Sequence, residues 1–367
     1  EACSEIETPE QEICLIHYNM AAKPWKYEDC VLGDYFWQYA EQLSVVEEIR
    51  SVGEHFTEED MEVDEETSRQ LLQICEDEIC KEDNYLNIRR FVAEKSQERL
   101  DAMEKIAQLE REGKFDVDVE QDPPGKELKP EDIHYLSRKT SSKIKTRMAY
   151  YLARKFVNHL ISEKQLIVKE IRGIEHFEAL ESGAVVTMNH FHPFDSFAAQ
   201  IVYEASGHRR RKFYRVIKEG NYTSFPGFYG VLMRNCNTLP LSSNKETMKK
   251  FLAAVDKVLR GGHFVLVYPE QSMWWNYRKP KPLKRGAFNF AVTSNVPVLP
   301  VFVTMEDSDV IGDDGFPVQA YTIHVGEPIY PDPSLGRRDN STYMLQENER
   351  IWREIYEGFY GVALTYN

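Results

Sequence analysis

Residues 185–196 read Val185-Val186-Thr187-Met188-Asn189-His190-Phe191-His192-Pro193-Phe194-Asp195-Ser196. The β-branched residues at the start predict a buried strand. The segment 192–196 predicts a tight turn into a helix, because proline is tolerated in the first helical turn and aspartate complements the positive end of a helix. This short stretch therefore predicts a strand, a turn and a helix start in direct succession.

The same turn can fold the carboxylate of Asp195 back onto the imidazole of His190. A carboxylate at one ring nitrogen holds a histidine in one tautomer, which leaves the other nitrogen free to take a proton from a hydroxyl. We therefore identify His190 as a candidate general base and Asp195 as its orienting group. A second hypothesis uses His190, His192 and Asp195 as the ligands of a metal-dependent hydrolase.

Composition limits the classes of protein to consider. The chain has 367 residues, 42% of them hydrophobic, and a formal net charge of −15. This length allows two domains, or one large domain with an appendage. The acidic balance argues against a general nucleic-acid binder, which needs a concentrated basic face. No apolar run approaches the roughly 18 residues of a membrane-spanning helix, so we expect any membrane contact to be peripheral.

The cysteines and the N-terminal residues indicate a cytoplasmic setting. Six cysteines are sparse for this length. Cys75 and Cys80 are spaced for neither a zinc site nor a redox pair, so we expect reduced structural thiols. The chain begins with acidic residues where a secretory signal would be basic and then apolar.

The N-terminal part of the chain has a helical pattern. Apolar residues recur at three- and four-residue steps among many charges at 41–112, which predicts amphipathic helices. Proline and glycine interrupt the polar segment 113–130, so we predict a helical N-terminal region with its linker at 1–130 and an α/β domain at 131–367. The helical region is either a simple appendage or an arm that docks a partner.

A basic segment follows this boundary. Residues 137–156 combine Lys143, Lys145 and Arg147 with several aromatic side chains. Such a helix suits an anionic lipid surface, although a solvated basic helix face has the same composition.

The remaining chain alternates β-rich and helical segments. This pattern predicts a mixed, largely buried α/β sheet flanked by helices, with sites at the carboxyl ends of its strands. An acidic loop is expected at 307–315 and an amphipathic closing helix at 343–360. The predicted strands are 166–171, 184–188, 212–217, 238–241, 263–268, 298–303 and 320–325.

Four segments in this part of the chain carry a family resemblance. They are Asn189-His190 to Asp195, then Phe-Pro-Gly-Phe-Tyr-Gly-Val-Leu-Met-Arg at 225–234, Tyr-Pro-Glu-Gln-Ser at 268–272 with Leu-Lys-Arg-Gly-Ala-Phe at 283–288, and Asn-Val-Pro-Val-Leu-Pro-Val at 295–301. Their order resembles the glycerolipid acyltransferase superfamily, which includes glycerol-3-phosphate and 1-acylglycerol-3-phosphate acyltransferases of the PlsC type. The marks of that family are Asn-His-x4-Asp, a glycine-rich second motif, a Phe-Pro-Glu-Gly-type third motif and a Val-Pro-Ile-x-Pro-type fourth. The resemblance covers 165–305.

The resemblance implies a fold and a reaction. It implies the glycerolipid acyltransferase fold and O-acyl transfer in phospholipid biosynthesis, from acyl-CoA or acyl carrier protein to a lipid hydroxyl, with no bound cofactor and no metal. His190 would be the general base and Asp195 its orienting carboxylate, with no covalent acyl-enzyme. Glu270 would help to bind the acceptor.

The chain departs from the family pattern where phosphate would be bound. Ser242-Ser243-Asn244 replaces an arginine of the second motif, and Gln271-Ser272-Met273 stands where many members have Gly-Thr-Arg. Neither serine nor methionine reproduces the guanidinium fork that suits phosphate. The acceptor therefore stays open between a lysophospholipid and a related lipid without phosphate. We expect Glu270, Gln271, Ser272, Arg234 and Arg285 to bind substrate, and Lys245, Arg278, Lys279 and Lys281 are further candidate cations.

The altered third motif also motivates a non-enzymatic hypothesis, a lipid-binding protein on an acyltransferase fold. The hypothesis that we favour is a cytoplasmic acyltransferase that associates peripherally with an anionic membrane surface. Its partners would be an acyl thioester and a lipid hydroxyl, and not a nucleic acid.

Overall fold

The computed structural model describes residues 16, 18, 23–27, 30–79, 85–119, 125–137 and 139–366. The chain divides into two compact units, Glu1–Phe91 and Val92–Asn367. Among the helices of the described ranges, none is both long and apolar enough to cross a membrane. Cys3, Cys14, Cys80 and Arg138 lie outside the described residues.

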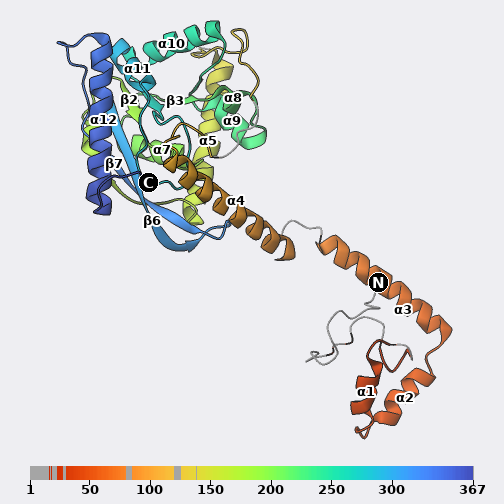
Figure 1. Cartoon of the computed structure of the whole chain (residues 1–367). Coiled ribbons are helices and arrows are strands. Elements are labelled where there is room, and N and C mark those ends of the chain that lie inside the picture. Colours follow the sequence, from red (N-terminus) through yellow and green to blue (C-terminus); the bar gives the residue numbers. More distant parts are fainter. Residues whose placement is uncertain are drawn as a thin grey trace. The chain divides into compact units, whose positions relative to one another are not determined.

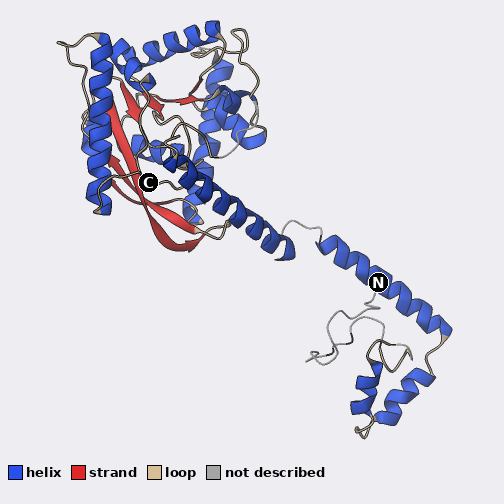
Figure 2. Cartoon of the chain, viewed as in Figure 1, coloured by secondary structure: helices blue, strands red, loops and turns tan. Residues whose placement is uncertain are grey.

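The first unit is helical, as the periodicity at 41–112 predicts (Figure 2). A reciprocal pair of bonds fixes the start of α3, because the Thr57 hydroxyl accepts from the Asp60 amide at 3.2 Å while the Asp60 carboxylate accepts from the Thr57 amide at 2.9 Å. Such a pair satisfies amides that have no partner within the helix. The helices are α1 (Gly33–Ala40), α2 (Val46–Glu54), α3 (Glu58–Ile79) and α4 (Tyr85–Arg111), of which α4 continues into the second unit.

The second unit is built on a seven-stranded sheet in the order β1-β7-β6-β2-β5-β3-β4 (Figure 1). The strands β6, β2, β5, β3 and β4 run parallel to one another, β7 is antiparallel to β6, and β1 is parallel to β7. The predicted mixed α/β sheet is therefore confirmed. The strands are β1 (Ile167–Arg172), β2 (Ala184–Thr187), β3 (Phe213–Ile217), β4 (Thr238–Pro240), β5 (Phe264–Val267), β6 (Val298–Ile311) and β7 (Pro317–Val325).

Helices cover both faces of this sheet. Val186 and Leu266 point to a core formed with α5, α6 and α7, whereas their neighbours Val185 and Val265 point to a second core formed with α10, α11 and α12. Alternate residues of a strand face opposite sides, so two apolar layers explain why these strands are apolar throughout. The helices are α5 (Thr140–Ser162), α6 (Ile174–Glu178), α7 (Asp195–Ala205), α8 (Glu219–Thr223), α9 (Gly227–Asn235), α10 (Lys245–Arg260), α11 (Gly286–Ser294) and α12 (Arg337–Tyr360).

The acidic loop predicted at 307–315 is wrong in its first part. Strand β6 continues to Ile311 and pairs with β7 through Asp307↔Gln319 and Ile311↔Pro317. The acidic side chain of Asp307 is compatible with a strand because it projects outward and forms an ion pair with Arg278 at 2.7 Å. Backbone pairing with β7 therefore overrides the loop-like composition.

Residues on both sides of position 113 pack within the second unit. Ile106, Leu109 and Val119 form a buried cluster with Trp274. Leu128 is also buried. The domain boundary at 130 stays a prediction, and the structure adds that 92–119 contributes core contacts beside the loop after β5. The aromatic stripe of the closing helix is core as well, with Trp352 and Tyr356 buried.

Candidate active site

The parallel strands β2 and β5 bring two predicted segments together. Their ends at Thr187 and Val267 are paired in register, so the chain leaves both strands at the same edge of the sheet. Asn189 then binds the backbone of β6 in both directions, since its side chain donates to the Val303 carbonyl at 3.0 Å and accepts from the Val303 amide at 2.8 Å. These bonds fix the backbone immediately before His190.

His190 and Asp195 form the predicted pair. Nδ1 of His190 lies 2.6 Å from Oδ2 of Asp195. Asp195 is the first residue of α7 and is buried, whereas 24% of the His190 side chain is exposed. Within the described residues, Nε2 of His190 has no hydrogen-bond partner. A carboxylate at Nδ1 favours the tautomer with its proton on Nδ1, which leaves a lone pair on Nε2.

Further donors hold Asp195 in place, among them the His192 amide at 3.5 Å from Oδ2. Oδ2 of Asp195 also accepts from the Phe191 amide at 3.2 Å, and its Oδ1 accepts from the Tyr268 hydroxyl at 2.6 Å. Burial and the neighbouring Asp195 carboxylate raise the pKa of Tyr268 well above its ordinary value, so this hydroxyl stays protonated and donates. The Tyr268 ring also stacks on the imidazole of His190, with centroids 4.1 Å apart and planes inclined by 18°.

His192 occupies a different environment. Its Nδ1 accepts from the Phe194 amide at 3.1 Å. Burial lowers the pKa of His192 to about 4, so the ring is neutral at physiological pH. In the described part of the chain, no group of three histidine, cysteine, aspartate or glutamate residues is arranged to hold a metal ion.

Glu270 contacts the backbone of this pair at His190. It is buried, and its two oxygens accept from the amides of His190 at 3.0 Å and Lys281 at 2.9 Å. The ammonium of Lys281, also buried, lies 3.4 Å from Oε2. Both carboxylate oxygens are thus bound within the protein. This geometry favours Glu270 as a group that positions the His190 backbone, and its predicted contact with the acceptor stays a prediction.

The two residues after Glu270 point in different directions. Gln271 is exposed and has a left-handed backbone with φ of 65°. Ser272 is buried, and its hydroxyl donates to the Phe115 carbonyl. Lys281 donates to the Ser272 carbonyl at 2.7 Å. Gln271 is therefore accessible to solvent, whereas Ser272 is buried and forms hydrogen bonds within the protein.

Most of the candidate cations already have partners. Arg234 donates to the carbonyls of Tyr222 and Phe225 at 3.2 and 3.1 Å. Arg278 forms an ion pair with Asp307 at 2.7 Å, and Lys279 does so with Glu110 at 2.6 Å. Arg285 instead lines a cavity of about 790 Å³. The catalytic candidates His190 and Asp195 are not among the residues that line it.

Sequence reasoning did not predict the contacts of two members of this site. Tyr268 and Lys281 reach Asp195 and Glu270 through contacts between separate segments. A tyrosine where the family pattern has phenylalanine was the available sign for Tyr268, because the added hydroxyl needs a partner when it is buried. Lys281 instead resembled a solvated surface cation.

Comparisons with known proteins give a family model and a solved structure to which this chain is similar. Residues 168–304 match a family model described as Acyltransferase. The crystal structure of the 1-acyl-sn-glycerophosphate (LPA) acyltransferase PlsC from Thermotoga maritima is similar over 63% of this chain and 87% of that chain, with 18% identity and a TM-score of 0.40. Among curated proteins, no relative matches the chain.

Proposed function

We propose that the protein transfers a fatty acyl group from an acyl thioester to the hydroxyl of a lipid acceptor, a proposal that the match of residues 168–304 to an acyltransferase family model supports. The donor is acyl-CoA or acyl carrier protein, and the acceptor is a lysophospholipid or a related lipid. The supporting observation is the 2.6 Å contact between His190 and Asp195, with the second nitrogen of His190 open.

The geometry supports a direct transfer. The acceptor hydroxyl donates to Nε2 of His190, which takes its proton as the oxygen attacks the thioester carbonyl. A C–O bond forms, the C–S bond then breaks, and the departing thiolate receives the proton from the imidazolium. Asp195, 2.6 Å away, stabilises the imidazolium between the two proton transfers. No acyl group is attached to the protein at any stage.

We also propose that α5 holds the protein on an anionic membrane surface. Ile144, Met148 and Tyr151 are 60%, 61% and 66% exposed and are spaced by four and three residues, so they share one face of the helix. The exposed cations Lys143 and Arg147 flank this face. An apolar stripe with flanking cations suits the boundary between lipid headgroups and acyl chains.

The C-terminal half of α5 contacts the segment of the candidate active site. Phe156 of α5 contacts Phe228 of α9, which is 36% exposed, at 5.2 Å between ring centroids. Phe156 also contacts Phe194, the residue before Asp195, at 6.0 Å. A lipid acceptor would therefore approach from a surface whose aromatic side chains lead to the His190 segment.

The metal-hydrolase hypothesis has no comparable support among the described residues.

The proposal is tested by incubating the full chain with a labelled acyl thioester and matched pairs of lysolipids, one phosphorylated and one not. We expect an acylated lipid to form in step with free thiol, for at least one acceptor. Thiol release without an acylated lipid would indicate a hydrolase. The absence of both products with coenzyme A and carrier-protein donors would contradict the proposal.

A further inference from the structure

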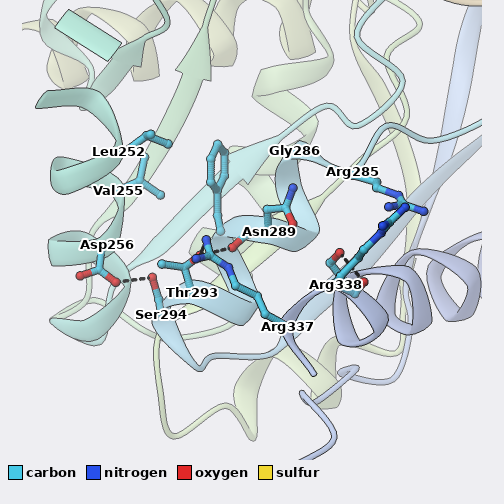
Figure 3. A pocket seen from close by; sticks show the side chains of 12 residues that line it. Leu252, Val255, Asp256, Arg285, Gly286, Asn289, Thr293, Ser294, Arg337 and Arg338 are labelled. Atoms are coloured by element: carbon cyan, nitrogen blue, oxygen red, sulfur yellow. Dashed lines mark hydrogen bonds between the residues drawn. The ribbon is translucent and has the colours of Figure 1, made fainter. Parts of the chain in front are cut away.

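Three arginines line a cavity between α10, α11 and α12 (Figure 3), and neither His190 nor Asp195 lines it. Arg285 precedes α11, and Arg337 and Arg338 begin α12. All three are exposed. Within the described ranges, none of them forms an ion pair.

Arg285 and Arg338 both line this cavity. In the view of Figure 3, Arg285, which precedes α11, and Arg338 of α12 extend toward the same part of the cavity. Two positive charges in one cavity repel each other, so an anion bound there would stabilise both guanidinium groups. A phosphate suits such a place, because each guanidinium presents a planar fork that matches two phosphate oxygens.

The rest of the lining does not cancel this charge. Asp256 contributes a carboxylate, but its Oδ1 already accepts from Arg260 Nε at 2.8 Å and from the Ser294 hydroxyl at 2.8 Å. Arg337 donates to the Thr293 hydroxyl at 2.6 Å, which fixes its position without neutralising it. The cavity therefore keeps an excess of positive charge.

Apolar side chains form another part of the lining. Leu252 lines the cavity and is 47% exposed, and the half-buried ring of Phe290 lies in the same lining. The volume of about 790 Å³ lies within the range of small-molecule sites. The site thus offers anion contacts together with an apolar surface.

We infer that this cavity binds a small molecule that carries a phosphate group, with Arg285 and Arg338 on the phosphate and Leu252 and Phe290 on the apolar part. Such a group is present in the nucleotide of coenzyme A, in a phosphorylated lipid headgroup and in free diphosphate. This inference does not depend on acyl transfer, because binding is measured directly.

The test is calorimetric titration of the full chain with coenzyme A, with a water-soluble dihexanoyl phosphatidic acid and with diphosphate. The double variant R285Q/R338Q removes two charges from the cavity, and K249Q/R353Q removes two exposed charges outside it. We expect saturable binding of at least one probe and a Kd about tenfold or more higher in R285Q/R338Q. The control variant should bind as the wild type does.

The preferred probe identifies the source of the phosphate. Tightest binding of coenzyme A, with the loss in R285Q/R338Q, assigns the cavity to the acyl donor, whereas tightest binding of the lipid assigns it to a phosphorylated acceptor or product. Equal binding of all three, with the same loss, assigns it to phosphate alone. An unchanged Kd in R285Q/R338Q, or no saturable binding of any probe, would overturn the inference.

Discussion

As a general base, His190 would need a hydrogen-bond partner at Nδ1 and a free lone pair on Nε2. Tyr268 contributes to the first requirement. Its hydroxyl donates to Asp195 at 2.6 Å while its ring stacks on the imidazole. The hydroxyl reaches the carboxylate oxygen opposite to the one that faces His190. We therefore propose that Tyr268 is a positioning residue that acts through Asp195.

Replacing Tyr268 by phenylalanine removes only the hydroxyl group and so tests this role. Y268F keeps the stacked ring but leaves Asp195 without one donor, so we expect kcat for acyl transfer to fall by about tenfold, or ~1.4 kcal/mol of barrier. The control is Y135F, which removes a hydroxyl that donates to the Pro240 carbonyl at 2.7 Å. Y135F should change stability and leave kcat unaltered. Wild-type kcat in Y268F would show that the hydroxyl has no part in positioning.

The turn after β5 contacts the His190 segment, because Glu270 accepts from the His190 amide at 3.0 Å. A buried pair, Glu270 and Lys281, spans the turn, and each side chain is 1% exposed. Burial lowers the pKa of Lys281, and the Glu270 carboxylate opposes that shift. Removing one partner of a buried pair leaves an uncompensated charge, which is more destabilising than removing both.

Variants of this pair give a prediction for the element. K281M should lower the free energy of unfolding by about 3 to 5 kcal/mol, measured by urea denaturation, because the Glu270 carboxylate then stays buried beside a neutral group. The double variant E270Q/K281M should recover a substantial part of that loss. If the losses of K281M and E270Q simply add in the double variant, the two side chains are not coupled.

Helix α5 is predicted to act as the membrane-binding element. Replacing three cations by glutamate in K143E/K145E/R147E should lower the partition coefficient for vesicles that contain anionic phospholipid by about 100-fold or more. The reason is that each basic residue near the headgroups contributes about 1 kcal/mol. Sedimentation with the vesicles measures this coefficient. Neutral phosphatidylcholine vesicles should show a smaller difference. The matched control K245E/K249E/K257E makes the same charge change on α10. Equal sedimentation of both triple variants would remove the membrane role of α5.

The whole molecule should lose stability in acid partly through His324 in β7. Its ring is buried, contacts the Thr304 hydroxyl at 2.9 Å and stacks edge-on with Phe359. Burial, with a smaller contribution from Arg172, lowers the pKa of His324 from 6.5 to about 4, whereas Glu170 raises it slightly. The unfolded chain therefore takes up a proton near pH 6.5 that the folded protein does not take up until about pH 4.

Stability should therefore be complete above pH 6.5 and decrease toward pH 4. The wild type should lose about 2 to 3 kcal/mol more than H324Q between pH 7 and pH 4, measured by denaturant unfolding at each pH. Comparison of the two curves removes the contribution of carboxylates that both proteins share. Parallel curves would show that His324 is not the responsible group.

Sequence patterns predict the parts of this molecule that depend on neighbours in the chain. The strand at 184–188 and the pairing of His190 with Asp195 are local, because one turn joins a β-branched run to a helix. The length of β6 is not local, since its acidic end is held by β7. Composition indicated a loop there, and backbone pairing determined a strand.

The positions of the remaining site residues depend on contacts between distant segments. Lys281 appeared to be a free cation until the fold placed it against Glu270 in the interior. Trp274 is buried in the same way by a distant segment, because the Val117 carbonyl accepts its indole N–H at 2.8 Å. Arg285 was predicted to bind substrate, and its place beside the start of α12 in one cavity follows from the packing of distant segments.

The most direct measurement is the rate of acyl transfer by H190A, with H55A, which changes an exposed histidine, as the control. We predict that H190A loses transfer by about 10²–10⁴-fold, with an unchanged circular dichroism spectrum and Tm, because the acceptor hydroxyl no longer has a base. H55A should transfer at the wild-type rate. Full activity in H190A would contradict the assignment of this imidazole as the general base.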